Sequence, residues 1–67
     1  MDVECYSGYT YAQEPRAFIW QGVRHVIKRI WRVWREPCGL YFMVETEGGL
    51  LCTLVYDEVQ DLWRIEG

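Results

Sequence analysis

Most of the side chains that could bind a charged ligand lie in one stretch, RHVIKRIWRVWRE, residues 24–36. The candidate binding residues of this stretch are Arg24, Lys28, Arg32, Arg35, Trp31 and Trp34. Cationic side chains contact phosphates, and aromatic rings stack on unpaired bases. The stretch therefore suggests direct binding of single-stranded nucleic acid as one possible function.

A second interpretation of the same stretch needs no ligand. Acidic residues on or beside later predicted strands could neutralise the cations through cross-strand ion pairs. These acids are Glu45, Glu47, Asp57 and Glu58. Each exposed pair would contribute only about 0.2–1 kcal/mol. The tryptophans would then belong to the core of a small fold.

The charge of the chain is unevenly distributed. The formal net charge is −3, yet residues 15–35 hold six cations and no acid. All ten acidic residues lie elsewhere, accompanied by Arg64 alone among the cations. The overall acidity counts against nucleic-acid binding, because domains with that function are usually basic.

The sequence contains no recognisable catalytic motif. Cys5, Cys38, Cys52 and His25 could in principle supply four zinc ligands, but no two of them have the close spacing typical of zinc sites. His25 is the only histidine, and no nucleophile or acid–base motif accompanies it. We therefore expect a protein that is not an enzyme, with no cofactor, no metal and no small-molecule substrate.

Strand-like segments recur between short turn signals along the whole chain. The predicted strands cover residues 3–11, 16–21, 23–36, 40–46, 50–56 and 62–65. This pattern predicts a single small domain, residues 1–67, of the all-β class. We expect a strongly bent antiparallel sheet, or a partly open barrel, of five to six short strands.

Residues 23–36 allow two structures. Their apolar residues follow a helical period, which would give an α+β fold with a helix at 23–36. The many β-branched residues and the missing N-cap favour a strand instead. A β-bulge at Lys28–Arg29 would let Ile30 and Trp34 continue the side begun by Val23, His25 and Ile27. We favour the bulged strand.

Tyrosines cluster near the start of the chain. Tyr6, Tyr9 and Tyr11 would lie on the first predicted strand, and an edge strand there would recruit partners by strand addition or self-pairing. Tyr9 and Tyr11 are therefore further candidate binding residues. We expect a protein partner or self-association ahead of nucleic acid.

The cellular setting follows from what the sequence lacks. Three cysteines without paired spacing do not indicate a disulfide framework. The acidic start, MDVE, is unlike a secretory signal, and no apolar run approaches the length of a membrane span. We therefore expect a cytoplasmic protein that does not bind membranes.

A wider pattern of residues links the predicted strands. It comprises Pro15, Phe18, Trp20, Gly22, His25, Ile27, Ile30, Trp34, Phe42, Val44, Thr46, Gly48, Gly49, Leu54, Tyr56, Asp57 and Trp63. This pattern resembles a family of small bacterial proteins catalogued as domain of unknown function 6504, over roughly residues 14–65. His25 departs from the family pattern, which has tyrosine at that place.

The resemblance implies a small β-rich domain and brings no established activity. Genes of the family often lie near those of lesion-bypass DNA polymerases, which implies a place in DNA metabolism. The sequence therefore predicts a non-catalytic binding module. The expected role is above all protein–protein interaction, within an assembly that acts in DNA metabolism. The alternative is direct binding of single-stranded nucleic acid through residues 23–36.

Overall fold

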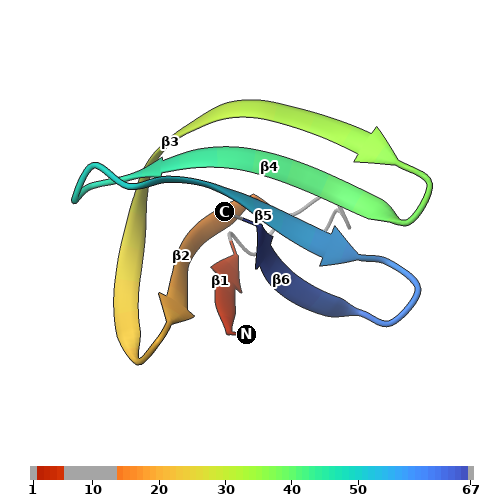
Figure 1. Ribbon diagram of the computed structural model, residues 1–67, viewed down its shortest axis with the longest axis horizontal. Helices are drawn as coiled ribbons and strands as arrows, with labels where there is room; N and C mark the ends of the chain where they lie inside the picture. The colour runs from red at the N-terminus through yellow and green to blue at the C-terminus, as the bar shows by residue number, and fades with distance from the viewer. Residues whose placement is uncertain (1, 6–13, 67) are drawn as a thin grey trace.

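The computed structural model describes residues 2–5 and 14–66. They form six strands: β1 Val3–Cys5, β2 Pro15–Trp20, β3 Val23–Glu36, β4 Gly39–Thr46, β5 Leu51–Asp57 and β6 Leu62–Glu66. Each strand pairs antiparallel with its neighbours in the chain, and the sheet curls into a half-barrel (Figure 1). The all-β prediction is confirmed, and the alternative helix at residues 23–36 is wrong because this segment is one continuous strand.

The structure describes only part of the strand that was predicted over residues 3–11. Its residues 3–5 form β1, whereas Tyr6, Tyr9 and Tyr11 lie outside the described residues. Within the described residues, the structure contains no helix that could cross a membrane.

Two-residue and four-residue turns join the later strands. Gln21 and Gly22 both have positive φ, 53° and 77°, between β2 and β3. Such a pair gives a tight hairpin whose twist matches that of its strands. Between β5 and β6, the carboxylate of Asp57 accepts hydrogen bonds from the amides of Val59 and Gln60, at 2.9 and 3.1 Å. Both turns lie between predicted strands, where the sequence places its short turn signals.

Strand β3 changes partner along its length and bends sharply as it does so (Figure 1). Residues 23–26 pair with β2, and residues 27–36 pair with β4. The register with β4 shifts twice, so that Lys28 and Trp31 are extra residues without a direct partner. An extra residue bends a strand and increases its twist. The bulge predicted at Lys28–Arg29 is confirmed, and the bulge at Trp31 is an additional one.

The second bulge corrects the predicted orientation of Trp34. Each extra residue moves the following side chains to the opposite face of the sheet. Ile30 packs against the core, as predicted, because one bulge precedes it. Trp34 follows both bulges and lies opposite Tyr41, on the face that points away from the core.

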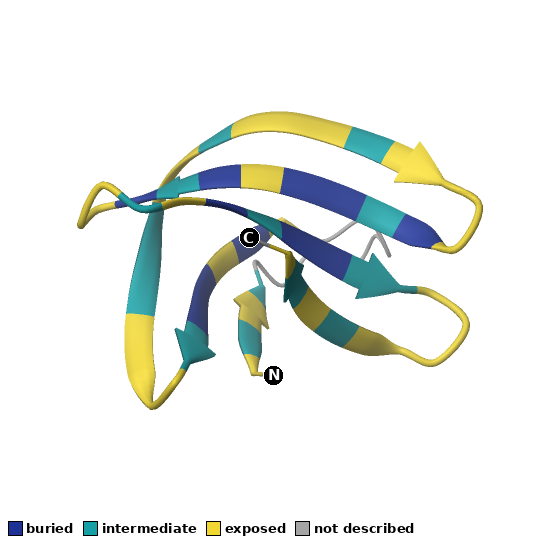
Figure 2. Ribbon diagram, in the orientation of Figure 1, coloured by how far each residue is buried: buried dark blue, intermediate teal, exposed yellow. Residues whose placement is uncertain are grey.

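The core lies on the concave side of the half-barrel, which we call the inner face. Its buried residues are Phe18, Phe42, Val44, Cys52 and Leu54, with Trp20 and Trp63 packed against them. Figure 2 shows that the dark blue buried segments concentrate on β2, β4 and β5. The other side of the sheet is called the outer face below.

Hydrogen bonds join the β4–β5 hairpin to the bend in β3. Thr46 is almost fully buried, and its hydroxyl accepts a hydrogen bond of 3.0 Å from the amide of Leu50. The amide of Glu47 donates to the carbonyl of Val26 at 2.9 Å, one residue before β3 changes partner. A buried hydroxyl with its partner in place avoids the cost of an unsatisfied polar group.

The close approach of β4 and β5 gives a test of the fold. A Cβ at Gly39 would lie 2.2 Å from the carbonyl oxygen of Tyr56, which is backbone and cannot rotate away. Overpacking of this kind costs about 1–3 kcal/mol, so Gly39→Ala should lower the free energy of unfolding by that amount in urea titration.

Gly48→Ala is the matched control for this test. Its added Cβ would find no neighbour closer than the Thr46 hydroxyl, at 3.8 Å. We expect a much smaller change in unfolding free energy for this variant. Equal effects of the two substitutions would contradict the register between β4 and β5.

Candidate binding surface

Side chains of β3, β4 and β5 form transverse rows on the outer face. One row runs from Trp34 through Tyr41 to Val55, because these residues are direct cross-strand partners. The next row joins Arg32 and Met43 in the same way. Side chains on neighbouring strands thus meet even though they are distant in sequence.

Cations and aromatic rings alternate along β3 on this face. The guanidinium carbon of Arg29 lies 4.8 Å from the centre of the Trp31 ring, and that of Arg32 lies 5.0 Å from the Trp34 ring. At exposed sites such contacts contribute about 0.5–1 kcal/mol each. Trp34 in turn stacks on Tyr41 with 5.4 Å between ring centres. We call Arg29, Trp31, Arg32, Trp34, Tyr41 and Met43 the outer patch.

Both indole N–H groups of the outer patch have partners within the chain. Trp31 donates to a carboxylate oxygen of Glu45 at 3.0 Å, and Trp34 donates to Glu36 at 2.8 Å. These hydrogen bonds, together with the stacked guanidinium groups, hold the rings in one orientation. The side chain of Trp31 is nevertheless 52% exposed. The patch is therefore an ordered surface that leaves apolar ring area in contact with water.

The four tryptophans divide into two groups. Trp20 and Trp63 pack against the core. This agrees with the interpretation in which the tryptophans belong to the core and no ligand is needed. Trp31 and Trp34 lie on the outer face, which the sequence left open. Trp31 faces outward because it follows the inward Ile30, and the extra residue at Trp31 turns Trp34 outward as well.

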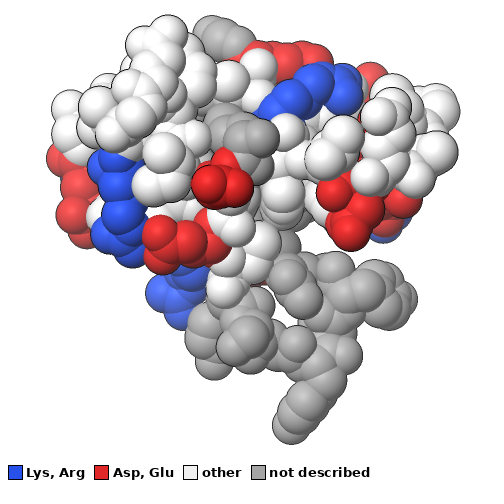
Figure 3. Space-filling view, turned by 90° about the horizontal axis from the view of Figure 1, so that it is seen from below, with Lys and Arg blue, Asp and Glu red and all other residues white. Residues whose placement is uncertain are grey.

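Ion pairs neutralise part of the basic block. Arg24 forms two hydrogen bonds with the carboxylate of Glu4, at 2.7 and 2.9 Å. The hydrogen bonds from Arg24 hold the pKa of Glu4 below its ordinary value. Arg35 pairs with Glu58, one of the acids expected to take this role. Figure 3 likewise shows blue and red side chains next to each other on the face seen from below.

The structure brings together only some of the predicted binding residues. Arg32, Trp31 and Trp34 belong to the outer patch, and Lys28 extends from the adjacent bulge. Arg24 instead pairs with β1, and Arg35 lies at the end of β3 beside Leu40. These two are therefore not part of the patch.

Other residues of the patch were not predicted. Tyr41 and Met43 reach it through cross-strand pairing, and Arg29 reaches it because the first bulge turns it outward. No short segment of the sequence indicates which residues of β3 and β4 lie opposite each other. Tyr9 and Tyr11, the remaining predicted binding residues, lie outside the described residues.

The cysteines are far from forming a metal site. Among the described residues, no three His, Cys, Asp or Glu side chains gather closely enough to hold a metal ion. Cys5, Cys38 and Cys52 are all free thiols. Burial raises the pKa of the thiols of Cys5 and Cys52, whereas Cys38 is exposed in the turn before β4.

This difference predicts the order in which the thiols react. The thiolate is the reactive form, so an exposed cysteine should react with an aromatic disulfide reagent well before the two whose pKa values are raised. We expect one fast thiol per native chain at pH 8, and its loss in Cys38→Ser. A fast phase that survives this substitution would show that Cys5 or Cys52 is accessible.

Comparison with known proteins gave no match, since no protein family, no curated protein and no solved structure matches this chain. The resemblance to domain of unknown function 6504 therefore stays a prediction. What the outer patch binds has to be inferred from its own geometry.

Proposed function

We propose that this chain is a non-catalytic binding module and that a partner protein docks on the outer patch. The observation that carries the proposal is the half-exposed ring of Trp31, held in place between Arg29 and Glu45. Tryptophan, tyrosine and arginine are the residues that contribute most to binding in protein interfaces. The patch offers tryptophan and arginine at its surface, and the buried Tyr41 supports the ring of Trp34 from beneath.

The neighbourhood of the patch also suits a protein partner. Met43 and Leu51 are exposed on the same face, at 37% and 60%, and extend the apolar area beyond β3. The rings are already ordered by stacking and hydrogen bonds, so docking would immobilise few side chains. A preorganised surface lowers the entropic cost of association.

The charges within the patch favour protein over nucleic acid. The carboxylates of Glu36 and Glu45 bind the two indole N–H groups and would repel a phosphate backbone at close range. Each ring also has a guanidinium group against it, where a base would otherwise stack. The resemblance to domain of unknown function 6504 adds a cytoplasmic DNA-metabolism assembly as the setting of this proposal.

The first test concerns Trp31. A partner that co-purifies with the tagged chain from its native host would be identified, purified and titrated by calorimetry. Trp31→Ala should weaken binding about 30-fold, which corresponds to the loss of about 2 kcal/mol typical of a central interface residue. Light scattering would show whether the partner is a second copy of the chain.

Val59→Ala is the control for the partner test. Val59 is 85% exposed at the turn between β5 and β6 and is not a residue of the outer patch. This variant should bind as the unchanged chain does, and urea titration should show that both variants remain folded. Unchanged affinity in Trp31→Ala would remove the outer patch from the interface.

Direct binding of single-stranded nucleic acid is the second candidate function. The observation that favours it is the row of Lys28, Arg29 and Arg32 beside the exposed ring of Trp31. If it holds, a labelled single-stranded oligonucleotide should bind at low salt and lose affinity steeply as salt rises. Our preferred proposal expects no binding at low salt, and saturable binding there would favour the nucleic-acid function instead.

A further inference from the structure

The second half of β3 forms an edge of the sheet. In the part of the chain that the structure describes, residues 27–36 pair with β4 on one side, and β2 leaves β3 after the pair of Ala17 with Val26. The backbone N–H and C=O groups on the other side of this segment therefore have no neighbouring strand among the described ones. Such an edge can accept an added strand. Residues 32–36 offer a regular stretch for it, because both bulges lie before them.

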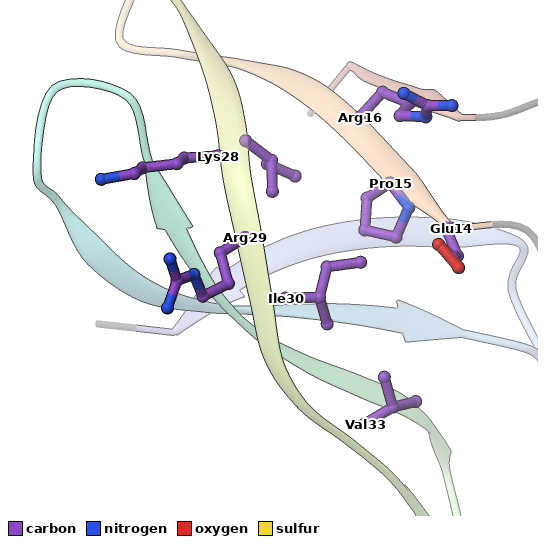
Figure 4. Close-up of a pocket in the computed structure, with 8 residues that line it drawn as sticks. Glu14, Pro15, Arg16, Lys28, Arg29, Ile30 and Val33 are labelled. Atoms are coloured by element: carbon purple, nitrogen blue, oxygen red, sulfur yellow. The ribbon is translucent and has the colours of Figure 1, made fainter.

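A cavity opens where β2 and β3 separate. Its volume is about 610 Å³, and its apolar lining consists of Pro15, Ile27, Ile30 and Val33. Figure 4 shows Pro15 opposite Ile30 and Val33, whereas Lys28 and Arg29 extend to the other side of β3. Val33 points to the inner face by its register with Phe42, yet it is 51% exposed. Among the described residues, the core therefore leaves an apolar place beside the edge uncovered.

The charge of this edge distinguishes between two possible partners, a second copy of the chain and a strand from another protein. Residues 27–36 contain four cations and one acid, a net charge of +3, of which the pair of Arg35 with Glu58 neutralises one positive charge. A second copy paired antiparallel at this edge would bring the basic segment opposite itself, and like charges on facing strands are destabilising. An acidic strand from another protein would instead match the charge of the edge.

The alternation of side chains along an added strand predicts which residue types the partner should carry at successive positions. Successive side chains of an added strand point to opposite faces of the sheet. Those on the inner side would meet the cavity beside Val33, and those on the outer side would meet Arg32. Aliphatic residues therefore suit the first set of positions and acidic residues the second.

We propose that the free edge of β3 binds an extended peptide segment of alternating acidic and aliphatic residues, added as a further strand with one aliphatic side chain in the cavity beside Val33. This site lies at the edge of the sheet and shares Arg32 with the outer patch, but its apolar contact is Val33. It depends on the backbone and on Val33, whereas the patch depends on the ring of Trp31. The two proposals can therefore fail independently.

The test uses the full chain and synthetic peptides. A labelled peptide of alternating glutamate and valine should bind in fluorescence anisotropy. A peptide of the same composition with its acids in one block and its valines in another should bind far more weakly, and so should a lysine–valine peptide. Slowed amide exchange at residues 32–36 should accompany binding, because an added strand protects the edge amides.

Val33→Asp is the informative variant, and Val23→Asp is its matched control. Both valines lie on β3 and have similar exposure, 51% and 55%, but Val23 pairs with β2. Val33→Asp should weaken binding of the glutamate–valine peptide about tenfold or more, because the apolar contact is lost and a negative charge faces an acidic ligand. Val23→Asp should leave it within about twofold of the unchanged chain.

Several results would overturn the proposal. Equal binding of the alternating and block peptides would show simple charge attraction, and no binding of either would remove the acidic ligand. Displacement of the bound peptide by a single-stranded oligonucleotide with higher affinity would assign the edge to nucleic acid. A dimer in light scattering that Val33→Asp dissociates would assign it to a second copy of the chain.

Discussion

The pairing of β3 with two different strands is the constraint on which the rest of the structure depends. Its first four residues form a hairpin with β2, and its remaining residues pair with β4 after a sharp bend. A regular strand could not satisfy both sets of hydrogen bonds while enclosing a core, because its direction changes too little per residue. The extra residues Lys28 and Trp31 supply the change of direction. The hydrogen bond from Glu47 to Val26 joins the β4–β5 hairpin to this bend.

The same two bulges also divide the side chains between core and surface. The inner face receives Ile27 and Ile30, which pack with Phe18 and Val44 in the core. The outer face receives the two tryptophans of β3 and the arginines stacked on them. The two bulges thus close the core and expose a preorganised aromatic surface. For this reason we connect the fold to a binding function.

Electrostatics plays a secondary part in stability and a larger part in selecting partners. The pairs Arg24–Glu4 and Arg35–Glu58 are about half exposed, so water and salt screen them. Because the folded-state pKa of Glu4 is lowered, its small contribution is present above the ordinary pKa of glutamate and is lost as the pH falls through the lowered value. Lys28, Arg29 and Arg32 lie on or beside the second half of β3, and the charge of this segment is the basis of the proposed peptide site.

Local chemistry in the sequence was enough to determine the strands, the Gln21–Gly22 turn, the first bulge and the uneven charge, because alternation, turn residues and net charge are properties of short segments. Only the tertiary structure decided that Trp34 points outward onto Tyr41, that Arg24 binds Glu4 twenty residues away, and that the second half of β3 pairs on one side only among the described strands. These features depend on the register between strands. Register is set by hydrogen bonds and packing across the whole sheet, and one extra residue at Trp31 reverses every side chain that follows it.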